Sequence, residues 1–221
     1  MSKRLAFIHT VTSLVGPFNK LCAELIPDAD IFHIADESLI QNVIRDGQMS
    51  IMTARRVVRY MISAEEAGAD LMMVTCSSVG DTVPIGQPLL HVPVYRVDQP
   101  MADKAVGLGQ RIGVAATLPT TLDPTARLIQ ARADASGKHV DVVSQLCQGA
   151  FDAVVSGDTA KHDKLVRQGL HELIDQVDVV VLAQASMARV VDTLPEEDRK
   201  VPILSSPRLA IEFLGQVMAS V

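Results

Sequence analysis

Tryptophan is absent from this 221-residue sequence, and aromatic residues make up only 3% of it. Runs of basic residues are absent too: 26 acidic residues outnumber 20 basic ones, and the formal net charge is -6. Proteins that bind nucleic acid use positive surfaces and, for single strands, aromatic side chains on which bases stack. With so little of either, the chain is not expected to bind nucleic acid.

Long apolar runs are also missing, and no stretch approaches the roughly 18 consecutive apolar residues of a membrane-spanning helix. The first apolar run, Leu5–Ile8, is too short for the core of a secretory signal. The three cysteines, Cys22, Cys76 and Cys147, are widely spaced and form no CxxC pair. Such a set fits a reducing compartment better than a disulfide framework or a metal site. We therefore expect a cytoplasmic protein with no metal and no membrane partner.

Short apolar runs bounded by turn residues alternate with helix-like stretches, and 48% of the residues are hydrophobic. This pattern predicts an α/β fold with parallel sheets. The expected strands are Leu5–His9, Ile31–Ile34, Leu71–Thr75, Val92–Tyr95, Ile112–Ala116, Val140–Ser144, Val179–Ala183 and Ile203–Ser205. The expected helices are Pro17–Ile26, Ser50–Ala67, part of Thr82–Leu90, Pro124–Ala135, Thr159–Asp175, Ser186–Leu194 and Pro207–Val221.

The two halves of the chain match each other element by element. Arg4–Thr10 pairs with Arg111–Thr117 at an offset of 107 residues, and Asp70–Ser78 pairs with Asp178–Ser186 at an offset of 108. Parallel α/β units resemble one another in general, but pairings in the same order at nearly constant offset go beyond that. We predict an internal duplication that gives two pseudosymmetric parallel-sheet domains. The expected bounds are 1-98 plus 208-221 for the first domain and 99-207 for the second.

Polar residues at the carboxyl ends of parallel strands line the crevice in which such sheets bind ligands. Cys76 lies at one such end and is followed by Ser77 and Ser78, while Gln184 holds the equivalent place in the second half. Helices that start there would present free N–H groups to an anion. They would also lower the pKa of the Cys76 thiol from its usual value of about 8.5. The pattern predicts a site for a small carboxylate beside a reactive thiol.

At these residues the chain resembles the aspartate/glutamate/hydantoin racemase superfamily. Val74–Ser78 and Leu182–Met187 match its two cysteine motifs, and Gly113–Thr120 matches its Thr-containing loop. The resemblance implies two pseudosymmetric domains with the active site in the cleft between them, no cofactor, and a possible homodimer. It also implies chemistry in which one cysteine removes the proton α to a carboxylate and the other protonates the opposite face.

The resemblance implies roles for individual residues. Cys76 would be the acid or base. His9 and Thr10 stand where many relatives carry Asp-Ser or Asn-Thr, a departure that points to a different substrate. Together with these two, the substrate-binding set would be Ser77, Ser78, Thr117, Thr120, Ala185 and Ser186.

Gln184 departs from the family pattern because an amide exchanges no proton near neutral pH. Racemisation by paired thiols is therefore not open to this chain. The resemblance extends to single-cysteine members such as arylmalonate decarboxylase and maleate isomerase. We predict one-sided proton transfer by Cys76, as in decarboxylation, elimination or isomerisation, with Gln184 bonding the substrate from the opposite face. The alternatives are a racemase in which His9, Cys147 or water supplies the second proton, and a non-catalytic carboxylate-binding protein.

Several other polar residues have structural explanations. Cys22 lies at helical spacing with Phe18 and Leu25 and is expected in the core. Asp36 is expected to cap a helix. The alternative is that Asp36–Ser38 forms a loop that recognises the far end of the substrate. Gly107–Gly109 lacks the third glycine of a dinucleotide loop. His33 is expected to bond locally, whereas His139, His162 and His171 are expected in solvated stretches.

Overall fold

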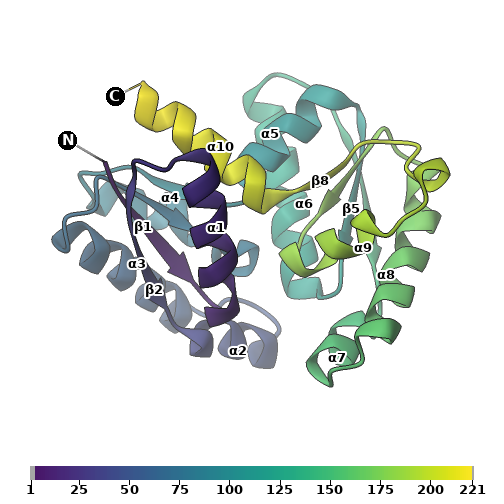
Figure 1. Cartoon of the computed structure of the whole chain (residues 1–221), viewed down its shortest axis with the longest axis horizontal. Helices are drawn as coiled ribbons and strands as arrows, with labels where there is room; N and C mark the ends of the chain where they lie inside the picture. The colour runs from purple at the N-terminus through teal and green to yellow at the C-terminus, as the bar shows by residue number, and fades with distance from the viewer. Residues whose placement is uncertain (1–2, 221) are drawn as a thin grey trace. The chain divides into compact units, whose positions relative to one another are not determined.

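The computed structural model describes residues 3–220. The chain divides into two compact units, residues 3–99 with 207–220 and residues 100–206. Each unit contains a four-stranded parallel sheet flanked by helices, and the strand orders, β2-β1-β3-β4 and β6-β5-β7-β8, are the same (Figure 1). The predicted fold class, α/β with two parallel-sheet domains from a duplication, is confirmed.

The first sheet consists of β1 (Arg4–His9), β2 (Asp30–Ala35), β3 (Leu71–Val74) and β4 (Val94–Arg96). Its helices are α1 (Val15–Leu25), α2 (Glu37–Asp46), α3 (Ile51–Glu66), α4 (Thr82–Gly86) and α10 (Ser206–Ala219). The last of these returns the chain to the first unit: α10, yellow in Figure 1, is tied to α1 by an ion pair between Arg208 and Glu24.

Both faces of the first sheet are covered, which explains why its central strands are apolar without alternation. Ala6 and Ile8 of β1 pack with the helices α2, α3 and α4 on one face. Leu5 and Phe7 of the same strand pack with α1 and α10 on the other face. A fully buried leucine or phenylalanine contributes about 1.5–3 kcal/mol, so these two layers hold the strand ends firmly in place.

The second sheet consists of β5 (Arg111–Ala116), β6 (Asp141–Leu146), β7 (Val179–Leu182) and β8 (Ile203–Ser205). Its helices are α5 (Gln99–Leu108), α6 (Pro119–Ala135), α7 (Ala150–Val155), α8 (Thr159–Ile174) and α9 (Ala188–Asp192). One face packs against α7, α8 and α9, and α6 packs on β5 and β6. The register repeats that of the first sheet, since Leu5 pairs with Leu71 and Ile112 pairs with Val179.

All eight predicted strands are present, each within two residues of its expected bounds. The helix expected from Pro124 begins earlier, at Pro119, because proline is well suited to a first helical position. Pro124 then lies inside the helix. The sequence did not predict α5, which contains a proline and a glycine, or the six-residue α7. No helix within residues 3–220 has the length and apolar character needed to cross a bilayer.

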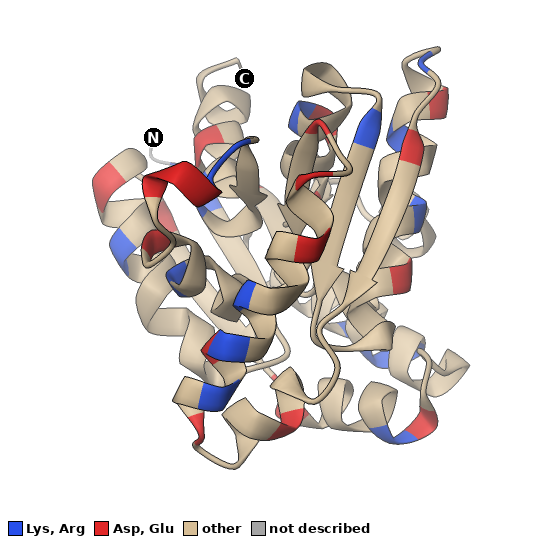
Figure 2. Ribbon diagram, turned by 90° about the vertical axis from the view of Figure 1, so that its right-hand side faces the viewer, with Lys and Arg blue, Asp and Glu red and all other residues tan. Residues whose placement is uncertain are grey.

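Acidic and basic residues are mixed along the chain, with 26 acidic and 20 basic residues in all. In the ribbon of Figure 2, the positions of basic residues (blue) and acidic residues (red) are interspersed along the helices that face the viewer.

Candidate functional site

Cys76 lies two residues past the end of β3, next to the end of β1. The pairing of Ile8 with Val74 brings Thr10 beside Cys76 two residues further on. The sulfur is hydrogen bonded by the hydroxyls of Thr10 and Ser78 and by the backbone N–H groups of Ser78 and Val79. Cys76 is the residue immediately before the short 3-10 helix Ser77–Val79. The predicted neighbours Thr10, Ser77 and Ser78 are therefore gathered around Cys76, and all three are buried.

Burial raises the pKa of the Cys76 thiol above its usual value, although hydrogen bonds from Thr10, Ser78 and Val79 act in the opposite direction. The expectation of a lowered pKa was therefore wrong. The helix that follows Cys76 has only three residues, too few for a substantial dipole, and the cost of desolvating a thiolate outweighs the hydrogen bonds. At neutral pH the thiol is protonated and can act as an acid.

An ion pair that the sequence did not reveal lies beneath the Cys76 segment. Arg96 at the end of β4 is buried and donates from Nε and Nη2 to the two carboxylate oxygens of Asp98, at 2.9 Å each. Its Nη1 donates to Asp81 at 2.6 Å. A Cβ on Gly80 would lie 2.6 Å from the Arg96 Nε, so only glycine leaves room for the guanidinium. Arg96 thus fixes the turn that follows Ser77 and Ser78.

In the second unit Gln184 occupies the position equivalent to Cys76 and bonds Thr117, the equivalent of Thr10. The Thr117 backbone N–H donates to the Gln184 Oε1 at 2.6 Å, and the Gln184 Nε2 donates to the Thr117 Oγ1 at 2.7 Å. The two halves therefore share one arrangement, in which the residue two positions past the third strand of the sheet bonds the threonine that follows the first strand. Gln184 is only partly buried, and Thr117 is buried.

Thr120 lies in the first turn of α6, three residues beyond Thr117. Its Oγ1 is buried and has no hydrogen-bond partner within the described part of the chain. A buried hydroxyl without a partner is uncommon and suggests a ligand or a water. Ala185 and Ser186 begin the short helix after Gln184, where Ala185 is half-buried and Ser186 is exposed. Thr117 and Thr120 are thus the polar hydroxyls best placed to serve a ligand in this unit.

His9 does not point toward Cys76. Its ring stacks with Phe7 and meets Phe18, on the sheet face covered by α1, whereas Cys76 packs with the cluster on the opposite face. Burial and the neighbouring His33 lower the pKa of His9 to about 4. A direct role for His9 as the second proton carrier at Cys76 therefore has no geometric support.

Cys147 and Cys22 are core residues. A Cβ on Gly169 of α8 would lie 2.6 Å from the Cys147 sulfur, which is packed beneath that helix. Burial raises the pKa of each thiol to about 11. The core position expected for Cys22 is confirmed, in α1 against the first sheet. Asp36 caps α2 as expected, accepting from the Ser38 backbone N–H at 3.1 Å.

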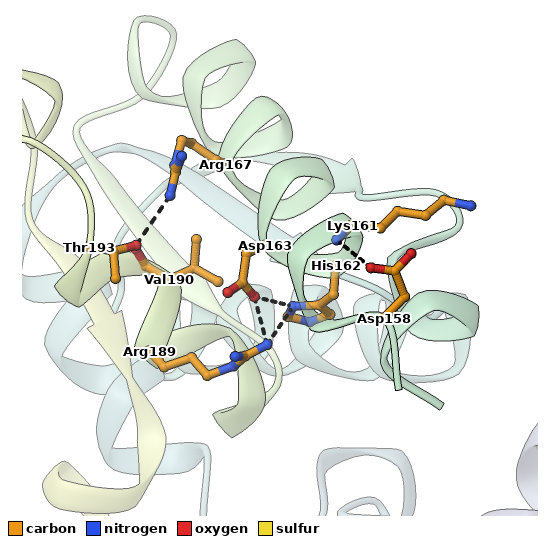
Figure 3. Close-up of polar contacts among 8 residues, drawn as sticks. All are labelled: Asp158, Lys161, His162, Asp163, Arg167, Arg189, Val190 and Thr193. Carbon is orange, nitrogen blue, oxygen red and sulfur yellow. Dashed lines mark hydrogen bonds and ion pairs between the residues drawn. The ribbon is translucent and has the colours of Figure 1, made fainter. Parts of the chain in front are cut away.

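His162 was expected to be solvated, and this was wrong: its side chain is fully buried. It lies in α8 at the spacing of Val166 and Leu170, which face the core, and that spacing was the available signal. Figure 3 shows its Nδ1 directed at Asp163 (2.8 Å), whose carboxylate also accepts from Arg189 of α9 at 2.6 Å. The cluster ties α9, and so the Gln184 segment, to α8. Within residues 3–220 no group of three or more His, Cys, Asp or Glu side chains is placed to hold a metal ion.

Comparison with known proteins assigns the family. The profile described as "Asp/Glu/Hydantoin racemase" matches residues 8–214. The chain belongs to this family. Comparison with curated protein sequences found no match. Membership of the Asp/Glu/hydantoin racemase family makes the chain a racemase- or isomerase-type enzyme and confirms the family predicted from the sequence.

Several solved racemase structures share the fold. A glutamate racemase from Bacillus anthracis is similar with a TM-score of 0.76 at 18% identity, covering 99% of this chain and 82% of that one. An allantoin racemase from Klebsiella pneumoniae gives 0.67 at 19% identity, covering 99% and 89%. An aspartate racemase homologue from Pyrococcus horikoshii gives 0.71 at 13% identity, covering 99% and 100%. At such low identity these similarities establish the fold alone.

Proposed function

We propose that this member of the Asp/Glu/hydantoin racemase family transfers a single proton, through Cys76, at the carbon α to the carboxylate of a small molecule. The proton is transferred at one face of the α carbon only, and the reaction is a decarboxylation, an elimination or an isomerisation. No cofactor takes part. Thr10 and Ser78 hold the thiol, and Thr117 and Thr120 bind the carboxylate. A cytoplasmic location, a homodimer and the lack of a nucleic acid partner remain predictions from the sequence.

The state of the thiol supports this chemistry. Because burial keeps Cys76 protonated, it is ready to deliver a proton to a carbanion or enediolate. In a decarboxylation the C–C bond to the leaving carboxyl group breaks, its electrons remain on the α carbon, and the thiol protonates that carbon. The thiolate left behind is stabilised by the donors from Thr10, Ser78 and Val79. Water then returns a proton to the sulfur.

The observation that carries the proposal is the bonding of Gln184, at the position equivalent to Cys76. Both ends of its amide engage Thr117, and an amide supplies no proton at neutral pH. Since the Thr117 Oγ1 accepts from Gln184, its own hydrogen is left to donate to a substrate carboxylate. The second Nε2 hydrogen of Gln184 is a further donor. We therefore expect the second unit to bind the substrate carboxylate without exchanging a proton with the substrate.

Deuterium incorporation tests the proposal. Wild type, Cys76→Ala and Cys147→Ala would be incubated in D2O with amino acids, 2-hydroxy acids, hydantoins and substituted malonates, and followed by NMR. We expect deuterium at one face of the α carbon, or release of CO2, in wild type and Cys147→Ala and none in Cys76→Ala.

Two other results would replace the proposal. Exchange with loss of optical activity would mean that the enzyme is a racemase with a second acid. Ligand protection of Cys76 from alkylation, without exchange or product for any compound, would indicate a non-catalytic carboxylate-binding protein.

A further inference from the structure

Four polar residues of the first unit form one connected hydrogen-bonded chain. The His9 Nδ1 lies 2.8 Å from the Thr75 Oγ1, and the His9 Nε2 lies 2.8 Å from the His33 Nδ1. The His33 Nε2 in turn lies 2.9 Å from the Oδ1 of Asn19. The residues come from β1, β2, α1 and the end of β3, which lie together in the first unit (Figure 1).

One arrangement of hydrogens satisfies this chain with both imidazoles neutral. The Asn19 carbonyl oxygen accepts from the His33 Nε2–H, so the His33 Nδ1 is free to accept from the His9 Nε2–H. The His9 Nδ1 then accepts the hydroxyl hydrogen of Thr75. The Thr75 hydroxyl also lies within hydrogen-bonding distance of the Ile8 carbonyl oxygen, at 3.1 Å, and this oxygen accepts the Thr75 backbone N–H at 3.0 Å as well. Every donor has an acceptor.

The surroundings of His9 and His33 favour the neutral form of both imidazoles. The ring contacts and hydrogen bonds of His9 and His33 among the described residues go to Phe7, Phe18, Asn19, Thr75 and each other, and none of these side chains is charged. Burial, together with the proximity of His33, lowers the pKa of His9 to about 4, and burial lowers that of His33. Thr75, His9, His33 and Asn19 therefore form a fixed hydrogen-bonded network at neutral pH, which we call the brace.

The brace lies directly behind the Cys76 site. Successive side chains of a strand point to opposite faces of the sheet. His9 and Thr75 bond each other on one face. The residues that follow them, Thr10 and Cys76, bond each other on the other face. Fixing the His9–Thr75 contact therefore fixes the two backbone segments that bring the Thr10 hydroxyl to the sulfur.

The second unit lacks this brace. By strand register, Ala116 corresponds to His9 and Ala183 to Thr75, while Thr117 and Gln184 correspond to Thr10 and Cys76. The sheet geometry therefore forms with two methyl groups at these places. Of the two units, the brace therefore occurs in the one that carries Cys76.

Resting on the proposed role of Cys76, we infer that His9 is a positioning residue for it: with Thr75 and His33 it holds Thr10 in hydrogen-bonding contact with the thiol.

The test uses Cys76 alkylation by iodoacetamide as a function of pH, which needs no substrate. The variants are His9→Ala, Thr10→Val and the two combined. Alanine is the residue that the second unit carries at the position of His9, so the backbone tolerates it. His9→Asn is the rescue variant, because its amide can still reach Thr75. Circular dichroism checks that each variant is folded.

We expect Thr10→Val to move the alkylation midpoint to higher pH, because the thiolate loses a donor. His9→Ala should move it in the same direction, the combined variant should move it no further than Thr10→Val, and His9→Asn should restore most of the shift. An unchanged midpoint in His9→Ala, or effects that add fully in the combined variant, would overturn the inference. Because alkylation requires no turnover, a lack of deuterium exchange would remove the proposed catalysis and leave this result intact.

Discussion

Gln184 holds Thr117 through both ends of its side-chain amide, with contacts of 2.6 Å to the backbone N–H and 2.7 Å to the hydroxyl. The equivalent pair in the other unit is Cys76 and Thr10, joined through the sulfur. The duplication has thus kept one geometry and changed its chemistry. One half carries a thiol that can give a proton, and the other carries an amide that orients a hydroxyl.

Gln184→Glu tests this orientation with almost no change in shape. A carboxylate cannot donate to the Thr117 Oγ1, so the Thr117 hydroxyl would turn to donate to Glu and be lost to a substrate carboxylate. A hydrogen bond to a charged group contributes about 1.5–3 kcal/mol, so carboxylate affinity should fall about tenfold to a hundredfold. Titration calorimetry measures it. Gln110→Glu, at the exposed opposite end of β5, makes the same charge change and should leave affinity unaltered.

Gly80→Ala tests whether Arg96 supports the Cys76 segment. The added methyl group would lie 2.6 Å from the guanidinium Nε, and relieving such overpacking costs about 1–3 kcal/mol. Urea unfolding should show that loss. In Gly16→Ala no atom lies within 4 Å of the new methyl group, and stability should be unchanged or rise by up to about 1 kcal/mol. Equal stability of the two variants would mean that Arg96 can move away freely.

The buried neutral His9 predicts acid destabilisation. As the pH falls below 6.5, His9 becomes protonated in the unfolded chain, whereas in the folded protein it stays neutral until about pH 4. The free energy of unfolding therefore decreases between these two pH values. At about 1.4 kcal/mol per pKa unit, the loss attributable to His9 reaches about 3 kcal/mol near pH 4. Unfolding free energies at pH 7 and pH 4.5 should therefore differ less in His9→Asn than in wild type. The exposed His139→Asn should behave like wild type, and equal differences in all three proteins would contradict the assignment.

The three thiols should react differently with iodoacetamide in the folded protein. Cys76 is partly exposed, although neighbouring atoms desolvate its sulfur, whereas Cys22 and Cys147 are buried with pKa values of about 11. Mass spectrometry should find modification at Cys76 alone. Because the pKa of Cys76 is also raised, the rate should still be rising above pH 9. A rate that levels off near pH 7 would mean a thiolate at neutral pH, and the thiol could not be the resting acid.

The sequence predicted those features that depend on neighbours along the chain. Apolar runs identified the strands, and the offset of about 108 residues placed Cys76 and Gln184 at equivalent strand ends. It could not predict the contact of Arg96 with Gly80, because that contact depends on the packing of β4 against a turn 16 residues earlier. It also missed how His9 points, since burial on the α1 face follows from the strand order and not from the residue itself. The raised pKa of Cys76 likewise depends on packing that local sequence does not reveal.

The most direct test of one-sided transfer follows the stereochemistry in D2O. With a compound converted by the wild type, chiral chromatography and NMR would give the configuration and deuterium content of the α carbon, in wild type and in Cys76→Ser. We expect deuterium at a single face, one configuration throughout, and no conversion by Cys76→Ser, since a hydroxyl is a far weaker acid than a thiol. A racemic, deuterated product from the wild type, or full conversion by Cys76→Ser, would contradict one-sided transfer by Cys76.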